Sequence, residues 1–281
     1  MSADRLVATC WTSAGDAEPQ GRELSPFPIL DRVRATAAAG WSGVGFGQDD
    51  LRHARDTIGF AALRAEIDDA RLSHVEVELA TDWWREDDAW RGTWKLLLDA
   101  AHQLNAVFIK AGPGMGEPPA DVTVFAAPLR RLAEEAADVG TRVALEPFPF
   151  GTIATIPQGV QVVRAADHPA LGLLVDFWHV FRAGTSFAEL REVLDPAILF
   201  GVELSDAELE VSGTLFEDTR DNRRLIGEGA QDVVGFIRTI REIGYRGPWG
   251  VEILSAEHRR RPLDEAMRVA YATAAETLAR A

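Results

Sequence analysis

The sequence predicts an α/β fold, an eight-stranded (β/α)8 TIM barrel, and two observations favour it. Short apolar runs rich in Val, Ile, Leu and Phe alternate with longer amphipathic stretches along the chain, as buried parallel strands alternate with helices. Eight such strand–helix units fill the 281 residues, close to the roughly 250 residues of a closed barrel. The alternative is an open doubly wound sheet, but no Gly-x-Gly-x-x-Gly motif follows the first strand. We therefore expect one barrel domain over residues 1–281.

The expected strands are short and mostly apolar. In chain order they are Leu6–Cys10, Gly43–Phe46, Ser73–Leu79, Ala106–Lys110, Arg142–Glu146, Leu171–Asp176, Ile198–Glu203 and Gly250–Ile253. Helical patterns fill the intervals, and Gly40, Gly140 and Gly244 are typical of helix ends. These helices are Ile29–Ala39, Phe60–Ala70, Trp90–Leu104, Val124–Val139, Val160–Ala166, Phe187–Leu194, Asp232–Ile243 and Leu263–Leu278.

Three long loops follow strands one, four and seven. They are Trp11–Phe27, Ala111–Val122 and Leu204–Ala230. Because each loop leaves the carboxyl end of its strand, all three lie at the face where barrel enzymes carry their active sites. We expect the functional site there.

Charge and composition exclude several classes of function. The chain has 29 Lys and Arg against 44 Asp and Glu, a formal charge of −15, which argues against nucleic-acid binding. It has no apolar run of membrane-spanning length, and a single cysteine can neither form an internal disulfide nor anchor a thiolate zinc site. No charged leader with a long apolar core begins the sequence, so we expect a cytoplasmic protein without a membrane partner.

Four consecutive strands each carry one acid at the end of an apolar run. These acids are Glu146, Asp176, Glu203 and Glu252, and small residues two positions earlier in three of the strands are expected to leave room beneath a site. Carboxylates that converge in a low dielectric repel one another unless a cation offsets them. Oxygen ligands suit a hard divalent ion, so Mg²⁺ or Mn²⁺ is the expected cofactor. The structural alternative is four separate acids in helix caps and surface ion pairs.

Other polar residues accompany these acids. His179 follows Asp176 by three residues and is either a functional group or a packed histidine. Lys110 ends the fourth strand, where it could polarise a substrate carbonyl or neutralise part of the acidic cluster. Glu78, nearest the mouth on strand three, could bind substrate or pair with Lys110.

Several motifs give the chain a family resemblance. They lie at Gly40–Val44, Val143–Pro147, Asp176–His179, Gly227–Gly229 and Gly244–Glu252. With them the chain resembles the sugar phosphate isomerase/epimerase family, the xylose isomerase-like barrels related to endonuclease IV.

The resemblance implies roles for individual residues. It implies metal ligands at Glu146, Asp176, Glu203 and Glu252, proton transfer by Glu146 and Glu252, and substrate contact by His179. It also implies an arginine near the substrate just before the Gly-Glu-Gly turn, for which Arg220 and Arg224 are candidates. Trp178, beside His179, is a further candidate for substrate binding. Many relatives have histidine where this chain has Glu203, although some dehydratases of the fold have glutamine there.

Three functional hypotheses follow. The first is a metal-dependent isomerase or epimerase of carbohydrate metabolism that acts on a hydroxy-carbonyl sugar or polyol through an enediolate. The alternative is a lyase of the same fold, either a dehydratase of 3-dehydroshikimate type or a 3-keto-glycoside eliminase. The third is a non-catalytic barrel subunit. The two enzymatic hypotheses imply a carbohydrate-like small-molecule substrate, and the resemblance adds that the protein can form homo-oligomers.

Overall fold

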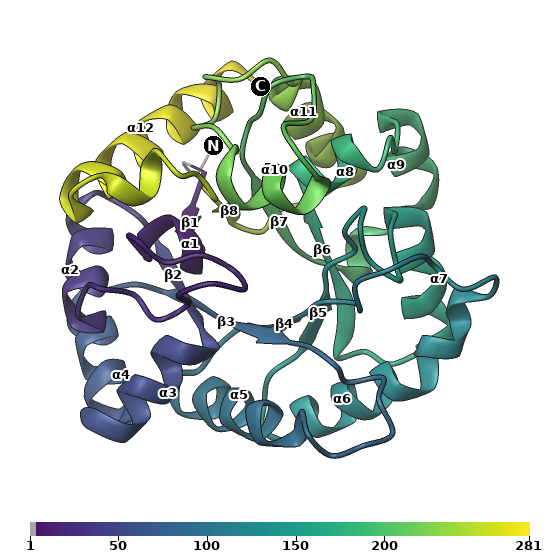
Figure 1. Cartoon of the computed structure of the whole chain (residues 1–281), viewed down its shortest axis with the longest axis horizontal. Coiled ribbons are helices and arrows are strands. Elements are labelled where there is room, and N and C mark those ends of the chain that lie inside the picture. Colours follow the sequence, from purple (N-terminus) through teal and green to yellow (C-terminus); the bar gives the residue numbers. More distant parts are fainter. Residues whose placement is uncertain (1–3) are drawn as a thin grey trace.

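The computed structural model describes residues 4–281 as a closed barrel of eight parallel strands (Figure 1). The strands follow one another around the barrel in sequence order, and β8 pairs with β1 to close it. The predicted barrel is therefore confirmed. The strands are β1 Leu6–Ala8, β2 Gly43–Gly47, β3 His74–Ala80, β4 Phe108–Ala111, β5 Val143–Leu145, β6 Leu171–Asp176, β7 Leu199–Leu204 and β8 Trp249–Val251.

Helices surround the strands in an outer ring (Figure 1). Eight of them match the predicted helices to within a few residues: α2 Ile29–Ala38, α4 Phe60–Asp69, α5 Arg91–Leu104, α6 Ala126–Asp138, α7 Ile156–Ala166, α9 Phe187–Val193, α11 Val233–Ile243 and α12 Leu263–Arg280. Four more lie in loops after strands and did not emerge from the sequence pattern: α1 Cys10–Ser13, α3 Gln48–Thr57, α8 Phe177–Arg182 and α10 Leu215–Asp221. Short 3₁₀ turns occupy Val122–Phe125, Pro196–Ile198 and His258–Arg260.

Local capping explains why these helices begin and end where they do. Thr155, Ser186 and Thr214 each form a capping box that starts α7, α9 and α10. Gly244 ends α11 with a φ of 108°, a left-handed conformation that glycine adopts without steric cost. The sequence indicated the end of α11 at Gly244, but α7 was expected to begin at Val160, later than the observed Ile156, and α10 was not predicted.

A compact layer closes the barrel interior beneath the strand ends. Phe108, Ala144 and Leu174 form a small cluster of fully buried apolar side chains. A Cβ atom on Gly201 would lie 3.1 Å from the Phe108 ring and 3.2 Å from Leu174. The room that small residues were expected to leave is therefore filled from the neighbouring strands, and this layer forms a solid floor.

Among residues 4–281, no helix combines the length and the apolar character needed to cross a membrane.

Candidate functional site

Four strand-end acids meet at the carboxyl end of the barrel. Asp176 ends β6 and lies opposite Glu203 of β7 in the strand register, and Glu146 and Glu252 directly follow β5 and β8. All four are at least nine-tenths buried. One oxygen atom from each lies within 4.8 Å of the others. The structure thus brings together the four residues expected as metal ligands.

Lys110 neutralises part of this acidic cluster. Its Nζ lies 2.8 Å from Glu203, 2.9 Å from Glu78 and 3.0 Å from Glu252, with Glu146 at 3.7 Å. Burial alone would lower the pKa of the ammonium, but attraction to these glutamates raises that pKa well above its usual value. The lysine therefore stays charged. It lies beneath the cavity rather than in its wall, so the structure favours the neutralising role over direct substrate contact.

Arg223 is the second cation of this buried cluster, and it was not selected from the sequence. Its Nη1 donates to Asp176 at 2.6 Å and lies 3.2 Å from Glu252. Burial lowers the pKa of the guanidinium, but Asp176 and Glu252 more than offset this effect and raise it. The backbone N–H of Arg223 donates to Leu254 at 3.0 Å, which ties the loop after β7 to the loop after β8.

The structure does not bring the other expected substrate residues to the cavity. Arg224 is largely exposed and pairs with Glu208 at 3.0 Å, and Arg220 pairs with its neighbour Asp221. Trp178 is fully buried behind the site, under the guanidinium of Arg223. The arginine that contacts the acids is Arg223, which lies between the two candidates in the sequence. Spacing before the Gly-Glu-Gly turn was the only sequence signal, and it could not separate adjacent arginines.

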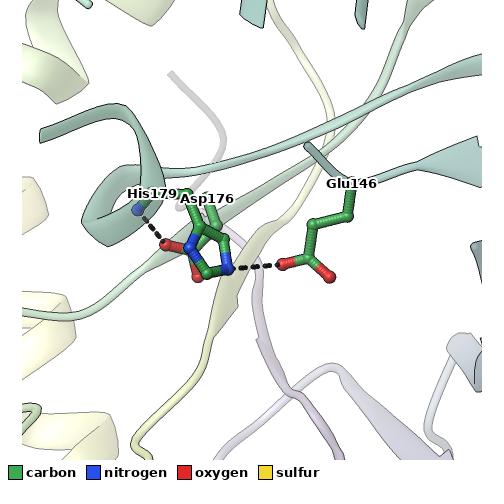
Figure 2. A group of neighbouring side chains, drawn as sticks. All are labelled: Glu146, Asp176 and His179. Carbon is green, nitrogen blue, oxygen red and sulfur yellow. Dashed lines mark hydrogen bonds and ion pairs between the residues drawn. The ribbon is translucent and has the colours of Figure 1, made fainter. Parts of the chain in front are cut away.

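His179 faces Glu146 across the site. Asp176 caps α8 by accepting a hydrogen bond from the His179 backbone N–H at 3.1 Å. This cap fixes the first turn of the helix and directs the imidazole toward the carboxylate of Glu146, as Figure 2 shows. His179 Nε2 lies 3.5 Å from Glu146 Oε1.

Negative charge exceeds positive charge in this cluster. Five buried carboxylates, including that of Glu78, surround the two cations Lys110 and Arg223. Burial raises the pKa of Glu252 to about 8, although Lys110 and Arg223 oppose the shift. Burial acts in the same direction on Glu146, but attraction to Lys110 and a hydrogen bond from His179 outweigh it and lower that pKa to about 2.

The excess charge and the donor atoms fit a divalent cation. Within residues 4–281, Oε2 of Glu203 is buried and has no hydrogen-bond partner, and Glu203 has a pKa raised well above its usual value by burial and by Glu252. A dication bound by Glu146, Asp176, Glu203 and Glu252 would supply the missing partner and offset the repulsion.

A cavity of about 480 Å³ opens above the acids. Glu78, Glu146, His179, Arg223 and Glu252 line its inner end, whereas Asp176 and Glu203 lie beneath them. A small molecule in this cavity would therefore meet three glutamates, an imidazole and a guanidinium.

Residues 33–273 match the family model described as the xylose isomerase-like TIM barrel. This chain belongs to that family. The family resemblance drawn from the motifs is thereby confirmed.

The curated proteins that match this chain include two kinds of enzyme. A 3-dehydroshikimate dehydratase of Pseudomonas putida is 35% identical over 135 residues, 48% of this chain and 21% of the relative. An inosose isomerase of Halalkalibacterium halodurans is 29% identical over 154 residues, 54% of this chain and 53% of the relative. The matches thus span about a fifth and about half of these relatives' lengths.

A solved structure shows the same fold. The IOLI protein with a bound zinc atom superposes with a TM-score of 0.84 at 18% identity, covering 98% of both chains.

Proposed function

We propose that this protein is a divalent-metal-dependent isomerase or epimerase that acts on a hydroxy-carbonyl sugar or polyol through an enediolate intermediate. The observation that carries the proposal is the pair of buried glutamates, Glu146 and Glu252, that face one cavity from a cluster with excess negative charge. The similarity to inosose isomerases supports a polyhydroxylated substrate.

Glu146, Asp176, Glu203 and Glu252 would hold the cation. When bound, it supplies Lewis-acid polarisation of the substrate's carbonyl and adjacent hydroxyl oxygens. The four carboxylates are hard oxygen donors, and this donor set favours Mg²⁺ or Mn²⁺.

The two glutamates can act as a base and an acid. Glu146 lines the cavity beside His179 and can remove the proton from the carbon next to the carbonyl. Glu252 lines the same cavity after β8 and can return a proton to the enediolate. Delivery to the neighbouring carbon isomerises the substrate, and delivery to the opposite face epimerises it. Arg223 lines the same cavity and can donate hydrogen bonds to substrate oxygens.

A lyase is the second candidate, and two observations favour it. The 3-dehydroshikimate dehydratases are 35% and 33% identical over their matches, against 29% for the first inosose isomerase. His179 lies beside Glu146 at the cavity, where it can protonate an oxygen that leaves from the β-carbon. This candidate includes dehydratases of 3-dehydroshikimate type and 3-keto-glycoside eliminases. The first step, proton removal next to a carbonyl, is common to both candidates.

One experiment tests the shared step. The protein is incubated with Mn²⁺ or Mg²⁺ in deuterated water with a panel of keto sugars, keto cyclitols and 3-dehydroshikimate, and carbon-bound deuterium is followed by NMR. We expect exchange next to the carbonyl in the parent and its loss in Glu146→Gln and Glu252→Gln. Glu228→Gln, an exposed acid outside the cavity, is the matched control.

The same assay separates the candidates. An isomer of unchanged mass supports the isomerase or epimerase, whereas loss of water or of an aglycone supports the lyase. A protein that binds metal yet exchanges no proton on any compound contradicts both and leaves the non-catalytic barrel.

A further inference from the structure

The mouth of the site cavity has two unlike walls. The loops after β4 and β5 and helix α10 contribute mainly apolar side chains, whereas the loops after β1 and β2 contribute polar and acidic side chains together with Trp11, Ala14 and Pro19. Because β1 and β5 lie across the closed barrel from each other, these walls face one another over the acids. The apolar wall comprises Pro113, Met115, Phe148, Phe150 and Phe216, and the polar wall comprises Gln20, Glu23, Gln48 and Asp49.

The aromatic rings of the apolar wall are held in one arrangement. Phe148 and Phe150 stack with their centroids 4.5 Å apart, and Phe216 meets Phe150 edge to face at 5.9 Å. Both geometries are favourable for aromatic pairs. Phe148 also lies 5.8 Å from the imidazole of His179, so the wall is continuous with the reactive end of the cavity.

Backbone contacts between two loops fix this wall. Met115 and Gly151 form an antiparallel bridge, the Thr152 N–H donates to Gly114 at 2.7 Å, and the Gly116 N–H donates to Phe150 at 3.0 Å. A Cβ atom at residue 151 would lie 2.6 Å from the Phe148 ring, so the close approach of ring and loop depends on that glycine. The wall is therefore formed before any ligand binds.

The aromatic surface that lines the cavity favours an apolar group on the ligand. Phe148, Phe150 and Phe216 are only partly buried, so each leaves apolar surface open to the cavity. Burying such apolar surface stabilises a complex, and exposed apolar patches rimmed by polar groups mark binding sites. A ligand hydroxylated on every side would place unsatisfied hydroxyl groups against these rings, which costs free energy. The cavity volume of about 480 Å³ lies in the range that accommodates a drug-sized ligand.

We propose that the apolar wall is a subsite for an aryl substituent, and that the substrate is a two-part molecule rather than a free sugar. Its polyhydroxylated ring lies over Glu146 and Glu252, and its aryl group packs against Phe150 and Phe216. The placement of the ring rests on the proposed function, whereas the subsite itself rests on the wall.

Two glycosides without a carbonyl group test the subsite. Methyl and phenyl β-D-glucopyranoside are titrated into the Mn²⁺-supplemented protein by calorimetry, and neither can undergo the proposed reaction. We expect the phenyl glycoside to bind at least tenfold more tightly. Phe150→Ala and Phe216→Ala should reduce this preference to less than threefold and leave the affinity for the methyl glycoside within twofold. Phe200→Ala is the matched control, because Phe200 lies on β7 next to the floor cluster and outside the cavity.

Three results would overturn the subsite: equal affinity for the two glycosides, a phenyl preference that survives both phenylalanine variants, or no measurable binding of either compound. Equal affinity would mean that the rings contact only the C–H face of a sugar. Failure of the proposed function is distinct, since it appears as absent deuterium exchange on keto sugars while the phenyl preference persists.

Discussion

The two ends of the barrel interior lie on the same strands but differ in the balance of their buried charged groups. At the lower end, His74 and Glu76 of β3 pair at 2.8 Å beside the floor of Phe108, Ala144 and Leu174. At the upper end, Glu78 of the same strand joins four other carboxylates around two cations. Buried charge stabilises a fold only when it is well paired. The lower end holds one acid with one hydrogen-bond partner, whereas the upper end holds five acids around two cations, an excess that fits the proposed dication.

The largest effect is expected at the upper end, where substitution of the acids should abolish metal binding. Protein purified without chelator should hold one Mn²⁺ or Mg²⁺ per chain, and the double variant Glu146→Gln/Glu252→Gln should hold none, because half of the ligand set is lost. Loss of an acid or base group should also reduce the rate of exchange by about 10²–10⁴-fold. Elemental analysis and the deuterium assay measure these effects. A parent protein without specific metal would contradict both enzymatic candidates.

Breaking the lower pair should affect stability alone. His74→Ala leaves the buried carboxyl group of Glu76 without its hydrogen-bond partner, so we expect the free energy of unfolding to fall by about 3 kcal/mol. Denaturant unfolding measures the loss, and elemental analysis of the folded variant should still find one metal ion. If metal content fell with stability, the two ends of the interior would not be independent.

Metal removal should lower the stability of the parent by a smaller amount. A cation at about 100 times its dissociation constant stabilises the native state by ~2.7 kcal/mol, which corresponds to roughly 5–10 °C in a domain of this size. Thermal unfolding with and without chelator measures the shift. The His74→Ala variant should show the same shift, and the double glutamine variant should show none.

The barrel and the meeting of the acids were predictable because closed parallel strands bring their ends together. Glu146, Asp176, Glu203 and Glu252 each follow an apolar run, so one rule placed them all.

The position of Arg223 was not predictable in this way. It lies in a long loop whose path depends on Asp206, whose carboxylate accepts hydrogen bonds from the backbone N–H groups of Gly227 and Gln231. Such contacts between distant residues leave no periodic signal. The same is true of the contact between Phe108 and Gly201, which closes the space beneath the acids.

Lys110→Met should shift metal affinity. The ammonium group of Lys110 competes with the metal ion for oxygens of Glu203 and Glu252. Its removal leaves these carboxylates more strongly attracted to the ion, so Mn²⁺ should bind about tenfold more tightly, roughly 1.4 kcal/mol. Calorimetry with Mn²⁺ measures the change. Weaker binding would instead mean that Lys110 holds the ligands in position.

The smallest effect is expected outside the site. Arg224→Ala removes only an exposed ion pair with Glu208 and should change stability by less than about 1 kcal/mol, without altering metal content. An effect of Arg224→Ala on substrate affinity would restore this arginine as a binding residue.

The bridge between Met115 and Gly151 has a consequence for engineering. Since the loops after β4 and β5 share backbone hydrogen bonds, a graft that exchanges one loop alone would leave backbone groups of the other without partners. The two loops therefore have to be exchanged together. Transplanting residues 112–116 together with 148–152 should carry the Met115, Phe148 and Phe150 part of the apolar wall to another barrel of this family, whereas either segment alone should not; Phe216 on α10 would have to be added separately.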